Sequence, residues 1–372
     1  MDIKKVFFWF HEHPELSYQE YRTTTKIAEI LKTTGAEILE TDLETGLIAV
    51  IRGKEEGPAI ALRSDIDALP IEEETGLEYK SRNPGVMHAC GHDFHITSLL
   101  GAADILARRK DEIKGRIYLI FQPAEEAPGG AKKVIQTGVL KDVREYFAIH
   151  TSPDHMPGTV GIRKGAVMAS VDRFQIHVNG KGSHAGHPDQ GIDPIVAAAA
   201  IVQNVQTIVS RNIEPFSPGL VSITHIKGGN TWNVIPQTVY MEGTVRSLSP
   251  DVRIQIKKRL DEIAVHTAAA YGAEAVTEWY EGPPAVINDE ELVKTAEKAA
   301  KTAGLVAEDT QPSLAGEDFS YYLENARGVF VRMGTGGRYP NHHPKFTVSC
   351  DALEKSAVFL AEAALNLIEH HH

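Results

Sequence analysis

Short apolar runs alternate with helical patterns through the first 150 residues, and this alternation limits the fold more than any other feature. Arg116–Gln122 is a continuous apolar run of the kind that is buried on both faces of a sheet. Pro58–Asp65 and Tyr146–His150 have the same character, while His95–Arg108 repeats its apolar residues at helical spacing. A helix over Thr23–Thr34 and a strand over Gly46–Ile51 are also predicted. The order predicts an α/β domain with a mixed, largely parallel sheet and flanking helices.

The pattern changes near Met168, where alternating strands of a second type begin. The elements predicted there are strands Arg173–Gly180, Val221–Ile226 and Thr238–Arg246, and helices Asp193–Ser210 and Asp251–Tyr271. Their order, β-α-β-β-α-β, is compatible with a small α+β domain inserted into the larger one. A chain of 372 residues is long enough for two such domains.

The boundaries follow from these patterns. We predict a larger domain from residues 1–167 and 282–369, with residues 168–281 inserted between its two parts. Pro283 and Pro284 mark the exit from the insertion, and helices over Glu290–Gly304 and Asp351–Glu369 return the chain to the larger domain. Residues 370–372 are histidines typical of an expression tag, and they are excluded from the fold prediction.

Charge and hydropathy exclude several classes of function. The formal net charge is −12, which repels phosphate and argues against a nucleic-acid partner. No stretch is long and apolar enough to cross a bilayer, so no membrane partner is expected. The apolar run near the start is too short for a signal-peptide core, which predicts a cytoplasmic protein. Cys90 and Cys350 are the two cysteines, too few for a disulfide framework.

The run His88–Asp93, which reads HACGHD, is the strongest cluster of metal-ligating residue types. It lies just before the predicted helix over His95–Arg108. A thiolate at Cys90 and an imidazole at His92, on either side of a glycine, can face one cation. Thiolate with imidazole suits Zn, Mn, Co or Ni better than Ca or Mg. A polar loop with a chance cysteine is the weaker interpretation.

A second cluster, Glu125 and Glu126, follows the strand Arg116–Gln122. Open α/β sheets bind ligands at this end of their strands. Two adjacent buried carboxylates are costly without a compensating charge, which a metal would supply. Neighbouring side chains point in different directions, so one can bind metal while the other accepts a proton from water. Taken alone, the pair is equally typical of a solvated acidic loop.

Two further elements carry imidazoles. His150 ends the predicted strand Tyr146–His150, and the run Pro340–Pro344, which reads PNHHP, presents His342 and His343 in a loop. A single histidine in either place is more often structural than a ligand. Together, however, the candidates are too many for one tetrahedral ion and suit two. Two divalent ions roughly 3.5–4 Å apart can polarise a carbonyl and activate water, which indicates a hydrolase.

These motifs resemble the dinuclear-metal aminoacylase family of peptidase-like amidohydrolases, which includes hippurate hydrolase, auxin-conjugate hydrolases, N-acetyldiaminopimelate deacetylase and bacterial N-acetylcysteine-type deacetylases. The resemblance rests on His88–Asp93, Pro123–Glu126 and Asn341–Pro344, and extends from His11–Glu15 to the last helix. It implies an α/β catalytic domain split by an inserted lid domain. It also implies an enzyme that uses two divalent metal ions to hydrolyse the amide bond of N-acyl, above all N-acetyl, amino acids.

The resemblance assigns roles within the catalytic domain. Glu125 would be the general base, and Asp65 the acidic residue that assists the site from the end of its strand. His342 is favoured over His343 as a ligand, because relatives keep the first histidine of the pair and vary the second. The implied metal ligands are Cys90, His92, Glu126, His150 and His342.

The resemblance also assigns roles in the lid. His184 would help to stabilise the developing oxyanion, while Asn233 and Arg246 would hold the substrate's carboxylate. In several relatives such lid groups reach across a dimer, so a homo-oligomer, a dimer or tetramer, is expected. Gly316–Phe319 resembles a substrate-side loop. The lid stretches Met168–Phe174 and Thr231–Pro236 resemble the N-acetylcysteine-type deacetylases most, which favours an N-acetylated, sulfur-containing amino acid.

Other interpretations stay open at this point. An N-acetyldiaminopimelate deacetylase, or an aminopeptidase or dipeptidase of the same two-metal design, would share the motifs. A non-catalytic metal-binding sensor would not need a base, so Glu125 argues against it. A structural zinc module fits poorly, because structural sites are closed and four-coordinate.

Overall fold

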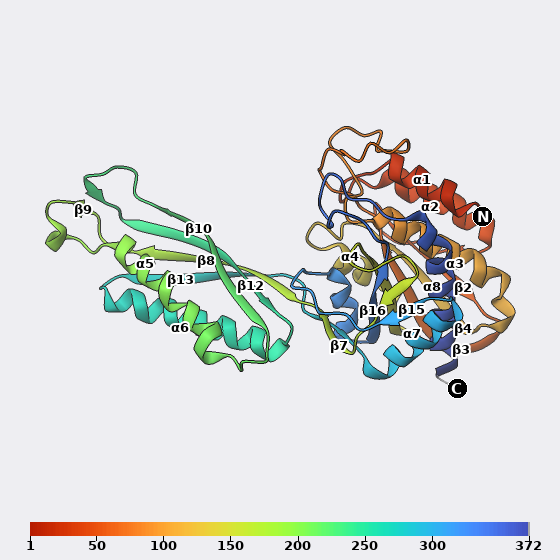
Figure 1. Ribbon diagram of the computed structural model, residues 1–372. Coiled ribbons are helices and arrows are strands. Elements are labelled where there is room, and N and C mark those ends of the chain that lie inside the picture. The colour runs from red at the N-terminus through yellow and green to blue at the C-terminus, as the bar shows by residue number, and fades with distance from the viewer. Residues whose placement is uncertain (371–372) are drawn as a thin grey trace. The chain divides into compact units, whose positions relative to one another are not determined.

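The structure is a computed structural model that describes residues 1–370 of the chain (Figure 1). It divides into two compact units. Unit 1 consists of Met1–Gly165, Ile287–Gln311 and Asp318–His372, and unit 2 of Ala166–Val286 and Pro312–Glu317. The predicted insertion, residues 168–281, lies inside unit 2. Of the predicted tag, His370 ends the last helix, while residues 371–372 lie outside the described part of the chain.

Unit 1 is built on an eight-stranded sheet with the order β1-β2-β4-β3-β5-β16-β6-β15. At its centre β3 runs parallel to β4 and β5, and β5 runs parallel to β16, whereas β2 is antiparallel to β4. The predicted mixed, largely parallel sheet is therefore confirmed. The strands are β1 (Glu37–Ile38), β2 (Leu47–Arg52), β3 (Glu55–Asp65), β4 (Lys114–Gln122), β5 (Val143–Ser152), β6 (Thr159–Gly161), β15 (Val306–Glu308) and β16 (Arg327–Gly334).

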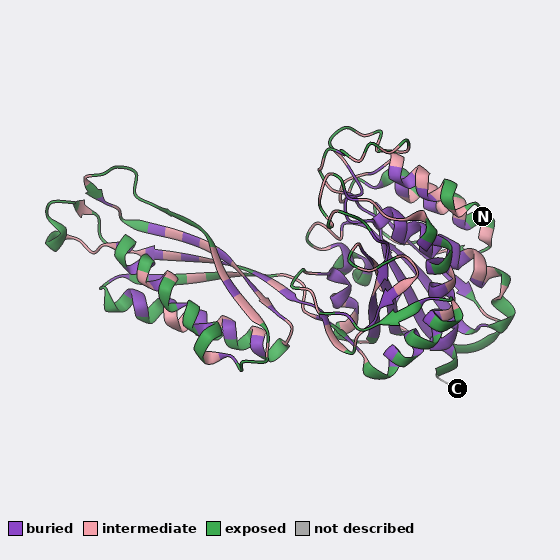
Figure 2. Cartoon of the chain, viewed as in Figure 1, coloured by how far each residue is buried: buried purple, intermediate pink, exposed green. Residues whose placement is uncertain are grey.

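Helices flank this sheet. They are α1 (Ile3–Glu12), α2 (Tyr21–Thr34), α3 (His92–Arg108), α4 (Gly130–Gln136), α7 (Glu290–Thr302) and α8 (Leu353–His370), with short turns of helix at η1 (Lys110–Glu112), η4 (Asp318–Glu324) and η5 (Cys350–Ala352). Helix α3 is buried along most of its length and packs with α8 into one hydrophobic core (Figure 2). Burial of this central layer fixes the position of the loop that precedes α3.

Several elements of unit 1 differ from the sequence-based prediction, among them α3, β16 and α1. Helix α3 begins at His92 rather than His95, because Gly91, with a φ of 83°, turns the chain directly into the helix. Strand β16 was not predicted, since its short apolar run is not followed by a helical pattern; it pairs with β5 and β6 inside the sheet. Helix α1 was not predicted either. It begins at Ile3 because the Asp2 side chain accepts a hydrogen bond from the Lys5 amide.

Unit 2 is a four-stranded antiparallel sheet with the order β10-β12-β8-β13. Figure 1 shows both of its long helices on one face of this sheet. The strands are β8 (Ser170–Asn179), β10 (Gly219–Gly228), β12 (Thr238–Ser247) and β13 (Glu274–Glu281), and the helices are α5 (Pro194–Asn204), α6 (Pro250–Ala270), η2 (Pro188–Gln190) and the π-helical η3 (Ile208–Asn212). The predicted α+β insertion is confirmed.

Short strands complete the description. Strand β9 (Ser183–His184) pairs with β11 (Val234–Ile235) in unit 2, while β7 (Gly165–Met168) and β14 (Val286–Asn288) lie where the chain passes between the units. None of the helices in residues 1–370 combines the length and apolar character needed to cross a membrane.

The register of unit 1 brings chemically active residues to one edge of its sheet. Asp65, the last residue of β3, lies opposite Gln122, the last of β4. Arg63 of β3 lies opposite Ala148 of β5, so His150 is at the level of Asp65. The carboxyl ends of these parallel strands form the edge where open α/β sheets bind ligands.

Candidate metal centre

His92 begins α3 and presents one ring nitrogen to the site. Its Nδ1 lies 2.9 Å from the carbonyl oxygen of Asp67 and 3.2 Å from the Asp67 carboxylate. A carbonyl oxygen can only accept, so Nδ1 carries a proton, and Nε2 is the nitrogen that a metal would bind. Nε2 is buried and has no hydrogen-bond partner in the described residues. A buried nitrogen without a partner is rare, and a bound cation would account for it.

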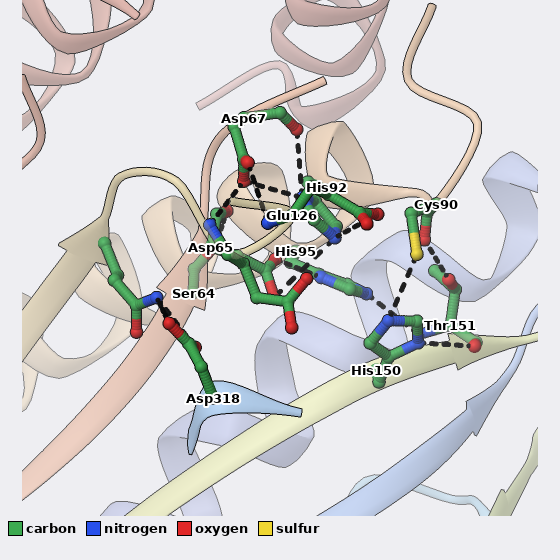
Figure 3. A network of polar contacts seen from close by, with 12 residues as sticks. Ser64, Asp65, Asp67, Cys90, His92, His95, Glu126, His150, Thr151 and Asp318 are labelled. Carbon is green, nitrogen blue, oxygen red and sulfur yellow. Dashed lines mark hydrogen bonds and ion pairs between the residues drawn. The ribbon is translucent and has the colours of Figure 1, made fainter. Parts of the chain in front are cut away.

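Cys90 and His150 face each other beside His92 (Figure 3). The Cys90 sulfur lies 3.4 Å from Nε2 of His150, whose Nδ1 donates to the carbonyl oxygen of Thr151 at 2.9 Å. Burial raises the pKa of the Cys90 thiol, and burial with the neighbouring His95 holds the pKa of His150 well below its usual value. His150 is therefore a neutral imidazole with Nε2 available to a metal, and Cys90 becomes a thiolate when a cation compensates its charge.

Glu126 and His342 form the other side of the centre. Nε2 of His342 lies 3.1 Å from Oε1 of Glu126, which is 4.0 Å from Nε2 of His92. The His342 amide donates to the carbonyl oxygen of Ala89, and His342 has a left-handed φ of 68°. This uncommon backbone conformation for a histidine aims its ring at Glu126.

His343 points elsewhere. Its Nδ1 accepts a hydrogen bond from the Lys345 amide at 3.0 Å, and its ring stacks on Tyr339 with the centroids 4.4 Å apart. Both interactions hold the imidazole away from Glu126. The geometry thus offers His342, and not His343, to the centre.

All five predicted metal ligands come together in two overlapping groups. Potential ligand atoms of Cys90, His92 and His150 lie within 4.8 Å of one another, and so do those of Cys90, Glu126 and His342. A thiolate, three imidazoles and a carboxylate form a donor set that suits a pair of first-row divalent ions. The residues present therefore fit a two-metal site, although ligation itself stays a prediction.

Glu125, the predicted base, lies at the edge of this cluster. Its carboxylate belongs to a third group, with His92 and Glu126, whose potential ligand atoms also lie within 4.8 Å of one another. The amides of Glu125 and Glu126 both donate to the Asp67 carboxylate, at 3.1 and 3.0 Å. Glu125 is only partly buried, and its carboxylate also lies in a group of potential ligand atoms with Glu317 and Asp318.

Asp67 is the residue to which the sequence analysis assigned no role. It is fully buried, and its carboxylate accepts from His92 Nδ1 as well as from the two glutamate amides. A carboxylate behind a metal-facing histidine fixes the ring's tautomer and orientation. The sequence did show a second aspartate two residues after Asp65, at the end of the same strand. It could not show which of the two carboxylates contacts the ring of His92.

Asp65 belongs to a deeper polar network. It accepts from Arg63 Nη1 at 2.6 Å and from His95 Nδ1 at 2.5 Å, and its nearer oxygen lies 3.8 Å from His92 Nε2. Burial alone would raise the pKa of Asp65, but the charges of His92 and Arg63 outweigh burial and hold it well below its usual value. Asp65 is therefore a buried carboxylate beside the centre, as predicted, with its assisting role untested.

His95 links this network to the strand that carries His150. Nε2 of His95 accepts a hydrogen bond from the Thr151 amide at 2.8 Å, so its Nδ1 proton points at Asp65. Arg63 also donates a 2.8 Å hydrogen bond to Asp318. This aspartate lies in the predicted substrate-side loop Gly316–Phe319. These buried partners compensate the Arg63 charge and stiffen the sheet edge beneath the centre.

The three predicted substrate-binding residues lie in unit 2. His184, in β9, is exposed and accepts from the Gly186 amide, and Asn233 lies beside it, because its carbonyl oxygen accepts from the Ala185 amide. Arg246 is half-buried near the far end of β12, and burial lowers its pKa. The structure brings His184 and Asn233 together, and it places Arg246 apart from them.

Comparison with known proteins identifies the family. The model of Peptidase family M20/M25/M40 matches residues 61–366, which include all five predicted ligands and Glu125. The chain belongs to this family. The predicted resemblance to dinuclear-metal amidohydrolases is thereby confirmed.

Curated relatives of this M20 protein span nearly its whole length. It is 48% identical over 359 residues, 96% of the chain and 86% of the relative, to the N-acetyl-L-cysteine deacetylase of Bacillus subtilis. It is 47% identical over 360 residues, 96% of the chain and 95% of the relative, to the N-acetylcysteine deacetylase of the same organism. The thermostable carboxypeptidase 1 of Saccharolobus solfataricus is 42% identical over 380 residues, covering 98% of this chain and 96% of that one.

A solved structure agrees with the fold. A Bacillus subtilis protein described as a dinuclear metal binding peptidase from the M20 family superposes with a TM-score of 0.91 at 43% identity, covering 99% of this chain and 98% of that one. We expected an enzyme that uses metal to hydrolyse the amide bond of N-acyl amino acids, and these comparisons confirm that expectation.

Proposed function

We propose that this M20 enzyme is a two-metal deacetylase of N-acetyl amino acids, with Cys90, His92, Glu126, His150 and His342 as metal ligands. One observation carries the proposal. The five side chains, drawn from four separate stretches of sequence, converge at one sheet edge with the carboxylate of Glu125 beside them. When bound, two divalent ions would polarise the amide carbonyl and lower the pKa of the attacking water. Mn, Zn, Co and Ni all suit this donor set.

The protein's own groups would move the protons. Glu125 would accept a proton from the attacking water and return it to the nitrogen of the leaving amine, acting first as base and then as acid. Asp67 holds the backbone amides of Glu125 and Glu126, so the base keeps a fixed position. Asp65 would assist by keeping a negative charge next to the His92 ring.

The distances within unit 2 support a homodimer. His184 and Asn233 adjoin β9 and β11, beyond the Thr238 end of β12, whereas Arg246 is eight residues further along that strand. At about 3.3 Å per residue this separation is roughly 26 Å, far longer than an amino acid. One copy cannot therefore place all three groups on the same substrate. A second copy would supply His184 to the oxyanion and Asn233 to the carboxylate that Arg246 binds.

The substrate we favour is an N-acetylated, sulfur-containing amino acid such as N-acetylcysteine. Two relatives of 47–48% identity are named N-acetylcysteine deacetylases, and the lid stretches resemble that group. A cytoplasmic location also stays part of the proposal.

A carboxypeptidase is the second candidate, because the 42% identical Saccharolobus relative is so named. Both reactions cleave an amide next to a free α-carboxylate, so one site could suit either. An aminopeptidase or a dipeptidase would need a free amine on the acyl side of the scissile amide. An N-acetyldiaminopimelate deacetylase would need the long, charged side chain of diaminopimelate on the amine side.

The deciding experiment is a substrate panel on enzyme reconstituted separately with Mn, Zn, Co and Ni. The panel compares N-acetylcysteine, N-acetylmethionine, N-acetylalanine, N-acetyldiaminopimelate, a blocked dipeptide and a free-amine dipeptide. We expect the N-acetylated sulfur amino acids to give the highest kcat/KM. A higher value for the blocked dipeptide would favour the carboxypeptidase, and one for the free-amine dipeptide would favour the aminopeptidase.

A further inference from the structure

The last turn of α1, with His11, and the segment His13–Glu20, which joins α1 to α2, supply three side chains to the surroundings of the metal centre. Most of the segment is irregular, so its position depends on side-chain contacts rather than on a ladder of backbone hydrogen bonds. We call His11, Ser17 and Glu20 together the N-terminal clasp. Each of them contacts a residue that adjoins a predicted ligand or the predicted base.

Ser17 makes the most direct of these contacts. Its hydroxyl donates to Oδ2 of Asp67 at 2.6 Å. The same oxygen accepts from the Glu126 amide, and Oδ1 accepts from the Glu125 amide and faces His92 Nδ1. One hydroxyl therefore helps to orient the carboxylate that holds a ligand imidazole and the backbone of both glutamates (Figure 3 shows Asp67 with His92 and Glu126).

Glu20 acts on the other side of the base. It is fully buried, and its Oε1 accepts from the Ala124 amide at 2.8 Å. Ala124 has a φ of 52°, a left-handed conformation that an alanine adopts only under constraint. Because Ala124 precedes Glu125, this hydrogen bond stabilises the turn that presents the base.

His11 acts at the start of α3. Its Nδ1 lies 2.6 Å from Asp93, and its Nε2 lies 3.3 Å from Glu73. Burial alone would lower the pKa of His11, but the two hydrogen bonds to carboxylates outweigh burial and raise it to about 9. Asp93 follows His92 directly, so the buried ion pair fixes the first turn of the helix that carries this predicted ligand.

We propose that the N-terminal clasp is a positioning shell of the metal centre, in which Ser17 acts through Asp67 on His92 and on the two glutamates. The inference rests on the proposed two-metal site and deepens it. None of the clasp residues belongs to the groups of potential ligands, so each works through another residue. Outer hydrogen bonds of this kind orient ligands, and their loss typically weakens metal binding or activity by about 10–100-fold when the partner touches the ligand directly. Ser17 contacts Asp67 and not a ligand itself, so we expect its loss to weaken metal binding or activity by about tenfold.

The test compares Ser17→Ala and Ser17→Thr with Thr25→Ala in the metal-loaded full-length enzyme. Thr25 is an exposed residue of α2 whose hydroxyl bonds only to the Tyr21 carbonyl oxygen, which makes it a matched control. The measurements are the rate of metal release to a chelator, the melting temperature, and kcat and KM for an N-acetyl amino acid. Ser17→Ala should release metal about tenfold faster and lower kcat about as much, with KM within about twofold. Ser17→Thr keeps the hydroxyl, so its metal-release rate and kcat should stay close to those of the wild type. Thr25→Ala should also match the wild type.

A double-mutant cycle separates positioning from general stability. If Ser17 acts through Asp67, Ser17→Ala should change metal release less than about twofold in an Asp67→Ala background, which lacks both acceptor oxygens. The same factor in both backgrounds would overturn the proposal, as would an unchanged release rate in Ser17→Ala. Metal release needs no substrate, so a wild-type enzyme that fails to deacetylate would reject the proposed reaction without deciding the role of the clasp.

Discussion

Unit 1 and unit 2 hold their functional residues in opposite ways. In unit 1 Cys90 and His92 are buried, although His342 is exposed, and behind them Asp65, Asp67 and His95 are buried with two or more polar partners each. In unit 2 His184 is exposed and Arg246 half-buried, with Asn233 in a loop. The difference agrees with the proposal that one chain arranges the chemical step, while a second copy would complete substrate binding. Mutations of the ligands and the base in unit 1 should therefore lower metal content or kcat, whereas mutations of the carboxylate-binding residues Asn233 and Arg246 in unit 2 should raise KM.

The largest expected effect comes from the base. Glu125→Gln keeps the size of the side chain but removes the proton acceptor, so kcat should fall by about 10²–10⁴-fold while metal content stays at the wild-type value. Kinetics and elemental analysis of the same preparation measure both quantities. Glu29→Gln, an exposed position on α2, is the control. A Glu125→Gln enzyme with normal turnover would remove Glu125 from the role of base.

Asp67→Asn should have the next largest effect. The amide keeps one acceptor oxygen but loses the negative charge that faces the His92 ring, so metal affinity and kcat should each fall about 10–100-fold. Titration of the apoenzyme with metal, followed by kinetics at saturating metal, separates the two losses. If metal affinity and kcat both stayed at wild-type values, Asp67 would have only a structural role, and the metal centre would not depend on this outer carboxylate.

Arg246→Ala should act on the substrate alone. Loss of a charge-assisted hydrogen bond costs about 1.5–3 kcal/mol, so KM for an N-acetyl amino acid should rise about tenfold or more while metal content is unchanged. The matching substrate is the same amino acid with its carboxylate converted to an amide, for which Arg246→Ala and wild type should be nearly equal. Equal losses on both substrates would argue against a carboxylate clamp.

Mixing subunits sharpens the same comparison. If Arg246 and His184 act from different copies, a mixture of the Arg246→Ala and His184→Ala enzymes, each weakly active when the substrate is well below KM, forms some mixed dimers with one intact site. Random reassociation in equal amounts should then recover about a quarter of the wild-type activity. No recovery after exchange, verified by mass spectrometry of the dimers, would place both residues in one copy's site.

Much of the centre could be predicted because the residues concerned lie at the ends of recognisable apolar strands. Asp65, Glu126 and His150 follow runs whose burial dictates a parallel sheet, and the parallel register brings their ends together. The family resemblance supplied the roles, and the backbone conformation of His342 agrees with its choice over His343.

What could not be predicted depends on contacts between residues far apart in sequence. The hydrogen bond from Ser17 to Asp67 and the pairing of His11 with Asp93 leave no periodic pattern. Strand β16 escaped prediction for a related reason, since it joins the sheet beside β5 only through pairing across 182 positions of sequence, from Glu145 to Arg327. Tertiary pairing, and not local propensity, decides such elements.

Metal content tests the central claim most directly. Elemental analysis of apoenzyme reconstituted with Mn or Zn should find two ions per chain in the wild type and in His343→Ala, and fewer in Cys90→Ala and His342→Ala. Full occupancy in both Cys90→Ala and His342→Ala would contradict the account, because the side chains that converge in the structure would then not be the ones that hold the ions.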